Sequence, residues 1–363
     1  MKHYKGLDSI RAMAVILVLF WHLMPRTLLI NSFDTGPFGV DIFFVLSGFL
    51  ITKILLENRR AAEISKVTIS HVLKNFYVRR VLRIFPIYYL TIALIFLYQI
   101  FINSDIEFDL LSCLTYTTNF HFFKTHSWGT FTGHFWSLAV EEQFYILWPV
   151  LILLFKKKYL IYLIVAFILV GIISQVILGK SEFSLILPHA CFDAFGLGAL
   201  LAWAMVYQPQ LLNNKNFNAL SIVAFASAVF ILAESIYKGV FELVPLRTFH
   251  SFIALWMITS VVFIERKGKS LSSLIYHNKI LIFIGKMSYG IYIYHVFFMY
   301  YWKFFGRVNK HLPLTTDFYN PYLLFTEYFC IIILLSWLSF KLIEQPFLNL
   351  KKYFSYSKKI VTI

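Results

Sequence analysis

Long apolar runs, separated by short polar stretches, follow one another along all 363 residues of the chain. A helix needs about 20 apolar residues to cross a bilayer, and ten runs approach or reach that length. They lie at approximately 10–30, 37–56, 84–102, 135–155, 159–178, 188–207, 217–236, 247–265, 280–301 and 322–343. The pattern predicts an all-α, polytopic transmembrane bundle that forms a single domain over residues 1–363.

The composition favours a membrane protein over a soluble one. Hydrophobic residues make up 59% of the chain and charged residues only 14%, whereas a soluble domain is about half apolar and about a quarter charged. Too little polar surface remains to cover a globule of this size.

The net charge of +15 does not indicate nucleic-acid binding, because the basic residues gather on alternate loops. With the N-terminus in the cytoplasm, 25 of the 33 Lys and Arg residues fall on the cytoplasmic side, as the positive-inside rule requires. The remaining eight are Arg26, Lys124, Lys180, Lys238, Arg247, Lys303, Arg307 and Lys310. An even number of spans returns the C-terminus to the cytoplasm.

Two loops are longer than the others. The cytoplasmic segment 57–83 is basic and is a candidate for an amphipathic helix, and the outer segment 103–134 carries several acidic and histidine residues. The three cysteines lie far apart, without the spacing of metal ligands. We therefore predict no disulfide and no metal site, and we interpret Cys191 and Cys330 as core residues.

Arg11 and His22 lie in the first span, eleven residues apart. At 3.6 residues per turn this spacing places both on one helix face, about 16 Å apart along the axis. Arginine is a natural phosphate ligand, and histidine can take and give a proton near neutral pH. The structural alternative is an arginine that snorkels to the membrane surface and a histidine that serves only in packing.

Carboxylates inside spans two and four are the next candidates, because ionisable groups within a membrane are costly and commonly functional. Asp41 lies near the outer start of span two, where it could also merely cap a helix. Ser137, Glu141 and Tyr145 form one stripe at i, i+4 and i+8, and Glu142 adjoins it. We expect Asp41, Glu141 and Glu142 to lie near His22 if the bundle brings these spans together.

Weaker candidates have structural explanations at least as good as functional ones. They are His189 and Asp193 at the start of span six, His295 in span nine, and Glu344 at the end of span ten. The basic run around Arg80 and Arg83 could dock a phosphorylated cytosolic ligand, or could simply reflect the positive-inside bias. The chain has no P-loop and no Gly-rich dinucleotide turn.

Several ordered motifs together resemble those of the acyltransferase-3 family of bacterial multi-pass membrane O-acyltransferases. They are Gly6 to Arg11 followed by His22, the run Gly39 to Ile51, the pair Arg80 and Arg83, the run Phe135 to Pro149, Ser288 to Tyr292 with His295, and Glu344-Gln345-Pro346. One departure is visible, because family members often carry Arg two residues before the acidic position 193, where this chain has Cys191. Some members also carry a C-terminal esterase-like domain, which we do not expect here.

The resemblance implies transfer of an acyl group, often acetyl, from cytosolic acyl-CoA to a hydroxyl of a carbohydrate acceptor. It also implies a multi-pass protein of the bacterial inner membrane, with the bilayer, acyl-CoA and a glycan or lipid-linked sugar as partners. Acyl-CoA would be a co-substrate, and no bound cofactor is expected.

The motif residues then suggest roles. We assign catalysis to His22, Asp41, Glu141 and Glu142, and donor binding to Arg11, Arg80 and Arg83. Ser137, Tyr145 and His295 are candidate acceptor or cavity residues, and Ser137 could also relay the acyl group. The alternative is a transporter or flippase for a lipid-linked sugar, since buried carboxylates and a histidine also suit proton coupling.

Overall fold

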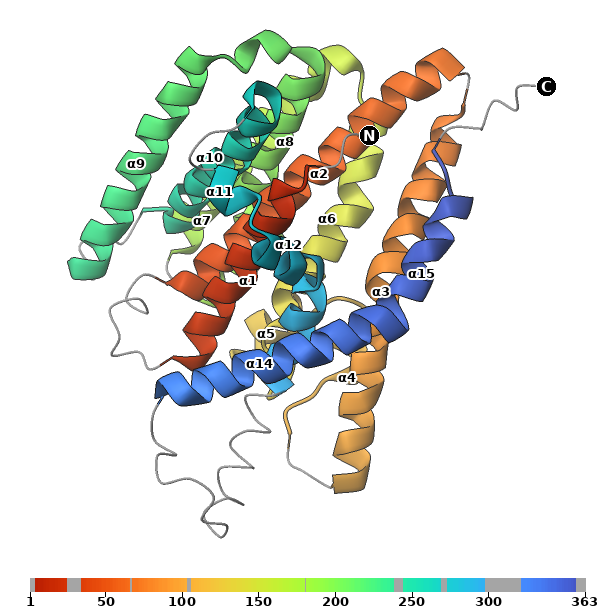
Figure 1. Ribbon diagram of the computed structural model, residues 1–363, viewed down its shortest axis with the longest axis vertical. Coiled ribbons are helices and arrows are strands. Elements are labelled where there is room, and N and C mark those ends of the chain that lie inside the picture. The colour runs from red at the N-terminus through yellow and green to blue at the C-terminus, as the bar shows by residue number, and fades with distance from the viewer. Residues whose placement is uncertain are drawn as a thin grey trace.

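The computed structural model describes residues 4–24, 34–65, 67–102, 106–179, 181–237, 244–268, 273–297 and 321–356, and in these ranges it contains helices and no strand. Nine helices of the described ranges are long and apolar enough to cross a membrane, and one bent helix pair brings the number to as many as ten. The predicted all-α polytopic bundle is therefore confirmed (Figure 1).

The long helices are α1 (Gly6–Leu23), α2 (Thr35–Ser65), α3 (Ile69–Ile102), α6 (Phe135–Leu154), α7 (Leu160–Leu178), α8 (Phe192–Tyr207), α9 (Asn214–Ile236), α10 (Leu246–Lys267) and α14 (Pro321–Ser339). The shorter ones are α4 (Leu110–Leu114), α5 (Thr118–Thr125), α11 (Ser273–Tyr276), α12 (Lys279–Lys286), the helix Ser288–Phe297, a π-helix (Phe340–Glu344) and α15 (Gln345–Asn349). The 3₁₀ helices are Lys157–Tyr159, Pro188–Cys191, Pro209–Leu211 and Leu350–Tyr353.

The basic segment 57–83 does not form a separate amphipathic helix, which corrects the sequence prediction. Instead α2 continues to Ser65 and α3 begins at Ile69, so the basic residues extend the two spans beyond their apolar parts (Figure 1). Arg59 explains part of this extension. Its Nη1 donates hydrogen bonds to the carbonyl oxygens of Ile152 and Phe155 at 2.8 and 2.7 Å. These lie at the end of α6, where the last carbonyls of a helix have no partner within the helix.

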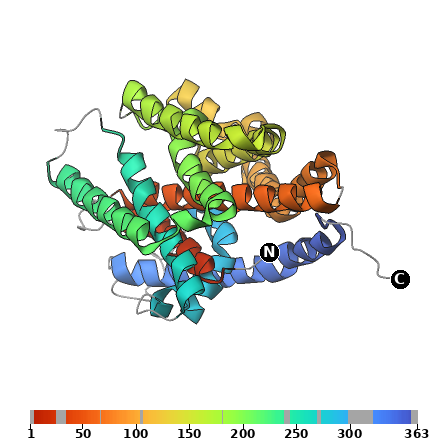
Figure 2. The same cartoon turned by 90° about the horizontal axis from the view of Figure 1, so that it is seen from above.

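Small residues allow α2 and α8 to pack closely at the centre of the bundle. A side-chain carbon at Gly48 would collide with the carbonyl oxygen of Phe195, and one at Gly198 would collide with that of Val45. Close backbone approach at small residues is how membrane helices gain packing contacts without a hydrophobic driving force. By contrast, α9 lies at the edge of the bundle and only 11% of its most apolar stretch is buried (Figure 1 and Figure 2).

The ninth span is broken rather than continuous. α12 and the helix Ser288–Phe297 are bent by 66° at Met287. Gly285 fits against the carbonyl oxygen of Asp8 on α1, so the first half of the span packs on the start of the chain. The predicted run 280–301 extends beyond these helices into residues outside the described ranges.

The cysteines are free in the described structure. Cys113 and Cys191 are buried, whereas Cys330 is exposed on the bundle surface. The interpretation of Cys330 as a core residue is therefore wrong, since an apolar run that faces lipid gives no signal that separates its two faces.

The start of α1, the α2–α3 junction and the C-terminal 3₁₀ helix all lie at one end of the bundle (Figure 1), which we call the basic end. The charge pattern predicts that this end is cytoplasmic. A cytoplasmic reporter should therefore be active when fused after Lys158 or at the C-terminus, and inactive when fused after residue 120. The opposite pattern of reporter activities would show that the protein has the reverse orientation in the membrane.

Candidate functional site

A cavity of about 390 Å³ opens among eight helical segments of the bundle. α1, α2, α3, α6, α12, the helix Ser288–Phe297, the π-helix and α15 each contribute to its wall. Its polar and charged lining residues are Asp8, Arg11, Ser47, Arg80, Arg83, Ser137, Glu141, Glu142, Tyr145, Lys286, Ser288, Tyr289, Tyr292 and Glu344. The fold thus gathers most of the predicted site residues around one space.

Arginines line the part of the cavity nearer the basic end. Arg80 and Arg83 lie three residues apart on α3 and share a helix face, and both line the cavity with Arg11. The guanidinium of Arg80 stacks over the Tyr145 ring at 4.9 Å from its centroid, and Arg11 forms an ion pair with Asp8 at 2.5 Å. This part of the cavity offers planar, multiply hydrogen-bonding cations of the kind that bind phosphates.

The predicted polar stripe on α6 faces the cavity. Ser47 of α2 donates a hydrogen bond to Glu141 Oε1 at 2.7 Å and lies 2.9 Å from the Tyr145 hydroxyl. Glu142, 9% exposed, lines the same wall. The cavity therefore runs along α6 from Tyr145 past Glu141 to Ser137, about 12 Å at 1.5 Å per residue.

A group of three histidines lies beyond the Ser137 end. The Ser137 and Tyr292 hydroxyls are 2.5 Å apart, and the Tyr292 ring centroid lies 5.4 Å from that of His295. The His295 ring in turn lies 4.9 Å from His22 and 4.8 Å from His134. We call His22, His134 and His295 the histidine cluster.

Contacts with backbone carbonyl oxygens indicate which ring nitrogen carries the proton in each residue of the histidine cluster. The Nδ1 atoms of His22 and His295 contact the carbonyl oxygens of Val18 and Tyr292 at 2.9 and 2.6 Å, and His134 Nε2 contacts that of Ile293 at 3.1 Å. Because a carbonyl only accepts, these nitrogens carry the protons in the neutral rings. His22 Nε2 therefore carries a lone pair that can accept a proton.

Asp41 is not joined to His22 in the way that the sequence argument expected. Its Oδ1 accepts hydrogen bonds from Arg247 at 2.6 and 2.9 Å, and its Oδ2 lies 3.2 Å from His250 Nδ1. Asp41 is fully buried and Arg247 is 8% exposed. The two oxygens of this carboxylate are thus held by α10, and α10 supplies the partners that sequence reasoning had missed.

Of the two sixth-span candidates, Asp193 bonds to α10 as Asp41 does, and His189 shares none of these bonds. Asp193 Oδ2 accepts a hydrogen bond from Thr248 at 2.7 Å, and Arg247 Nη1 donates to Cys191 Sγ at 3.0 Å. His189 lies in the 3₁₀ turn Pro188–Cys191 that precedes α8. None of these residues lines the cavity described above.

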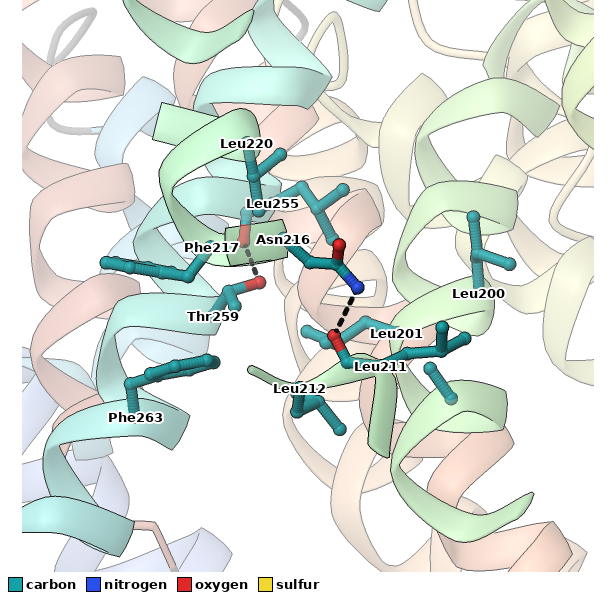
Figure 3. A pocket seen from close by; sticks show the side chains of 11 residues that line it. Leu200, Leu201, Leu211, Leu212, Asn216, Phe217, Leu220, Leu255, Thr259 and Phe263 are labelled. Carbon is teal, nitrogen blue, oxygen red and sulfur yellow. Dashed lines mark hydrogen bonds between the residues drawn. The ribbon is translucent and has the colours of Figure 1, made fainter. Parts of the chain in front are cut away.

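A second pocket, of about 160 Å³, lies between α8, α9 and α10 and is lined mainly by leucine and phenylalanine side chains (Figure 3). Its polar side chains bond to nearby backbone, since Asn216 donates to the carbonyl oxygen of Leu211 at 2.8 Å and Thr259 donates to that of Leu255 at 2.7 Å. It contains none of the predicted site residues. In the described residues no group of three or more metal-ligating side chains comes together.

Similarity to known proteins extends over nearly the whole chain. A family model described as an acyltransferase domain matches residues 4–354. A Staphylococcus aureus protein named as a candidate O-acetyltransferase is 29% identical over 381 residues, covering 96% of this chain and 58% of its own length. A peptidoglycan O-acetyltransferase of Listeria monocytogenes is also 29% identical, over 81% of this chain and 49% of its own length.

A candidate peptidoglycan O-acetyltransferase of Bacillus subtilis is 38% identical over 159 residues, which are 41% of this chain and 23% of the relative. The chain thus spans about half the length of the relatives that it matches over most of its own residues. No solved structure matches it.

Proposed function

Because this chain belongs to the acyltransferase-3 family, we propose that it transfers an acetyl group from cytosolic acetyl-CoA to a hydroxyl of a cell-envelope carbohydrate. One observation supports this most directly. One cavity is lined by three arginines that can bind phosphates, Arg11, Arg80 and Arg83, and also by Ser137 and Tyr292. His22 and His295 do not line it, but the Tyr292 ring lies 5.4 Å from that of His295. Phosphates held by the arginines would direct the pantetheine arm along α6 toward the histidines.

His22 is the general base in this proposal. Its Nε2 takes the proton of the acceptor hydroxyl while that oxygen attacks the thioester carbonyl carbon. The hydroxyls of Ser137 and Tyr292 contact each other and donate to the carbonyl oxygen of His134 at 3.1 and 3.3 Å. They would turn from this carbonyl to donate hydrogen bonds to the oxyanion that forms. When the tetrahedral intermediate collapses, the carbon–sulfur bond breaks and the CoA thiolate takes the proton from the imidazolium. The products are the acetyl ester and free CoA.

Labelled acetyl-CoA supplied to membrane vesicles tests this function. We expect inverted vesicles, which expose the cytoplasmic face, to transfer label to a glycan, and vesicles without this protein to transfer none. The glycan that gains label identifies the acceptor. Movement of a lipid-linked sugar without consumption of acetyl-CoA would instead support the transporter or flippase alternative.

The arginines give a more specific prediction. Arg80→Ala or Arg83→Ala should raise the apparent KM for acetyl-CoA about tenfold or more, since a charge-assisted hydrogen bond contributes about 1.5–3 kcal/mol. Steady-state kinetics with varied acetyl-CoA measures this change. A loss of kcat with an unchanged donor KM would argue against a ground-state phosphate contact, and Arg60→Ala, on the cytoplasmic extension of α2, provides a control outside the cavity.

A further inference from the structure

The last span is interrupted by a π-helix, Phe340–Glu344, between α14 and α15. A π-helix forms i→i+5 hydrogen bonds in place of the i→i+4 bonds of an α-helix, is rare, and is frequently found at functional sites. Here the π-helix ends on Glu344, which lines the cavity and is only 5% exposed. The interruption therefore places a buried carboxylate in the cavity wall.

Glu344 is not satisfied by the protein around it. Its Oε1 is buried and has no hydrogen-bond partner among the described residues. Residue 290 on the facing helix is glycine, and a Cβ built there would lie 3.4 Å from Oε1, so no side chain covers this oxygen from that direction. A buried polar atom that lacks a partner costs free energy unless a ligand supplies one.

The cations that interact with Glu344 do not account for it either. Arg83 lines the same cavity, but no described cation comes within 4.0 Å of the Glu344 oxygens to form an ion pair. Asp8 and Lys286 are further charged residues of the same wall. The carboxylate therefore shares the cavity wall with cations that can bind phosphates, but it forms no ion pair with any described one.

We propose that Glu344 binds the acyl donor directly, by accepting a hydrogen bond from an N–H or O–H group of acyl-CoA. This inference rests on the proposed function. A phosphate cannot be the partner, because it offers only negative oxygens to a carboxylate. Acyl-CoA carries suitable neutral donors on both sides of its phosphates, namely the amide and hydroxyl groups of pantetheine and the amino and hydroxyl groups of adenosine. Glu344 would therefore distinguish acyl-CoA from other polyphosphates that the arginines alone would accept.

Binding of acetyl-CoA to the purified full chain tests this role, by titration calorimetry on wild type, Glu344→Leu and Glu344→Gln. Leucine removes the acceptor, so its Kd should rise about tenfold to 100-fold, the range for a hydrogen bond to a charged group. Glutamine keeps an acceptor oxygen and should lose less. Glu63→Gln, an exposed carboxylate of α2 paired with Arg59, should bind as wild type does.

Unchanged or tighter binding of acetyl-CoA by the Glu344 variants would overturn the proposal. If Glu344 only offsets the charge of Arg83, its removal leaves the phosphate site more positive, and both variants should bind acetyl-CoA as tightly as wild type or tighter. If Glu344→Leu fails to fold, Glu344→Gln still decides, because equal or tighter binding contradicts a ligand contact. The melting temperature of each unliganded variant separates folding from binding.

Acetyl-pantetheine, which lacks the nucleotide, locates the contact. Weaker binding of acetyl-pantetheine by Glu344→Leu supports a partner on pantetheine, and an effect seen only with acetyl-CoA supports one on adenosine. Wild-type protein that fails to bind acetyl-CoA at all would overturn the proposed donor itself. Normal wild-type binding with unaffected Glu344 variants would overturn only the inference on Glu344.

Discussion

Replacing His22 with alanine should lower acyl transfer by about 10²–10⁴-fold, the usual contribution of a positioned general base, while the bundle stays folded. His22 Nδ1 is engaged with the Val18 carbonyl, so Nε2 is the nitrogen that can take the acceptor proton. His22→Gln retains most of the volume and can hydrogen-bond, but it cannot take up a proton at neutral pH. It should therefore be nearly as inactive as His22→Ala.

Two comparisons separate chemistry from packing in this experiment. His277→Gln changes an exposed histidine of the short segment that follows α11 and should leave activity unchanged. Expression level and detergent monodispersity show whether the His22 variants fold. Near-wild-type turnover of His22→Gln together with an inactive Glu141→Gln or Glu142→Gln would assign the base to a carboxylate.

Arg247→Ala should destabilise the protein by about 3–5 kcal/mol, because it leaves the fully buried Asp41 carboxylate without its main cation. The free energy of unfolding in detergent, followed by denaturant titration, measures this loss. His250, 3.2 Å from the other carboxylate oxygen, can offset only part of it. The yield of folded protein should fall in parallel.

A matched control and a rescue sharpen the test. Arg266→Ala removes an exposed arginine from the same helix α10 and should change stability little. Asp41→Leu combined with Arg247→Met replaces the pair with apolar groups and should recover much of the loss. If Arg247→Ala unfolds as wild type does yet transfers no acyl group, the network serves catalysis rather than stability.

The sequence could predict those parts of the site that lie within one helix. The i, i+4, i+8 spacing identified Ser137, Glu141 and Tyr145 as one stripe, and all three line the cavity. Helical periodicity is fixed by backbone geometry, so residues that share a face of one helix can be predicted without knowing how that helix packs.

Partners on different helices could not be predicted in this way. Asp41 was expected near His22, but its hydrogen-bond partners are Arg247 and His250 in the first turns of α10. The sequence argument counted Arg247 among the outer basic residues because it stands at the edge of an apolar run. The roles of Ser47 and Tyr292 could not be predicted either, because their partners lie on another helix. Ser47 bonds to the Glu141 carboxylate and Tyr292 contacts the Ser137 hydroxyl.

Local irregularities were also invisible to hydropathy. An apolar run reads as one span whether it is straight, broken at Met287 or carries a π-helix at Phe340–Glu344. Such irregularities depend on whether neighbouring helices satisfy the freed backbone groups. Whether those partners are present depends on how the helices pack, which the hydropathy of one apolar run does not show.

The break at Met287 also constrains the order in which the protein can be made. α12 has 8 residues, a length of about 12 Å, so this first half cannot cross a hydrocarbon core of about 30 Å alone. Lipid cannot supply hydrogen-bond partners to the backbone groups at the bend. Gly285, just before the bend, packs against the carbonyl oxygen of Asp8 in α1. During synthesis, this segment should therefore leave the translocon and settle only after the N-terminal helices have assembled to receive it.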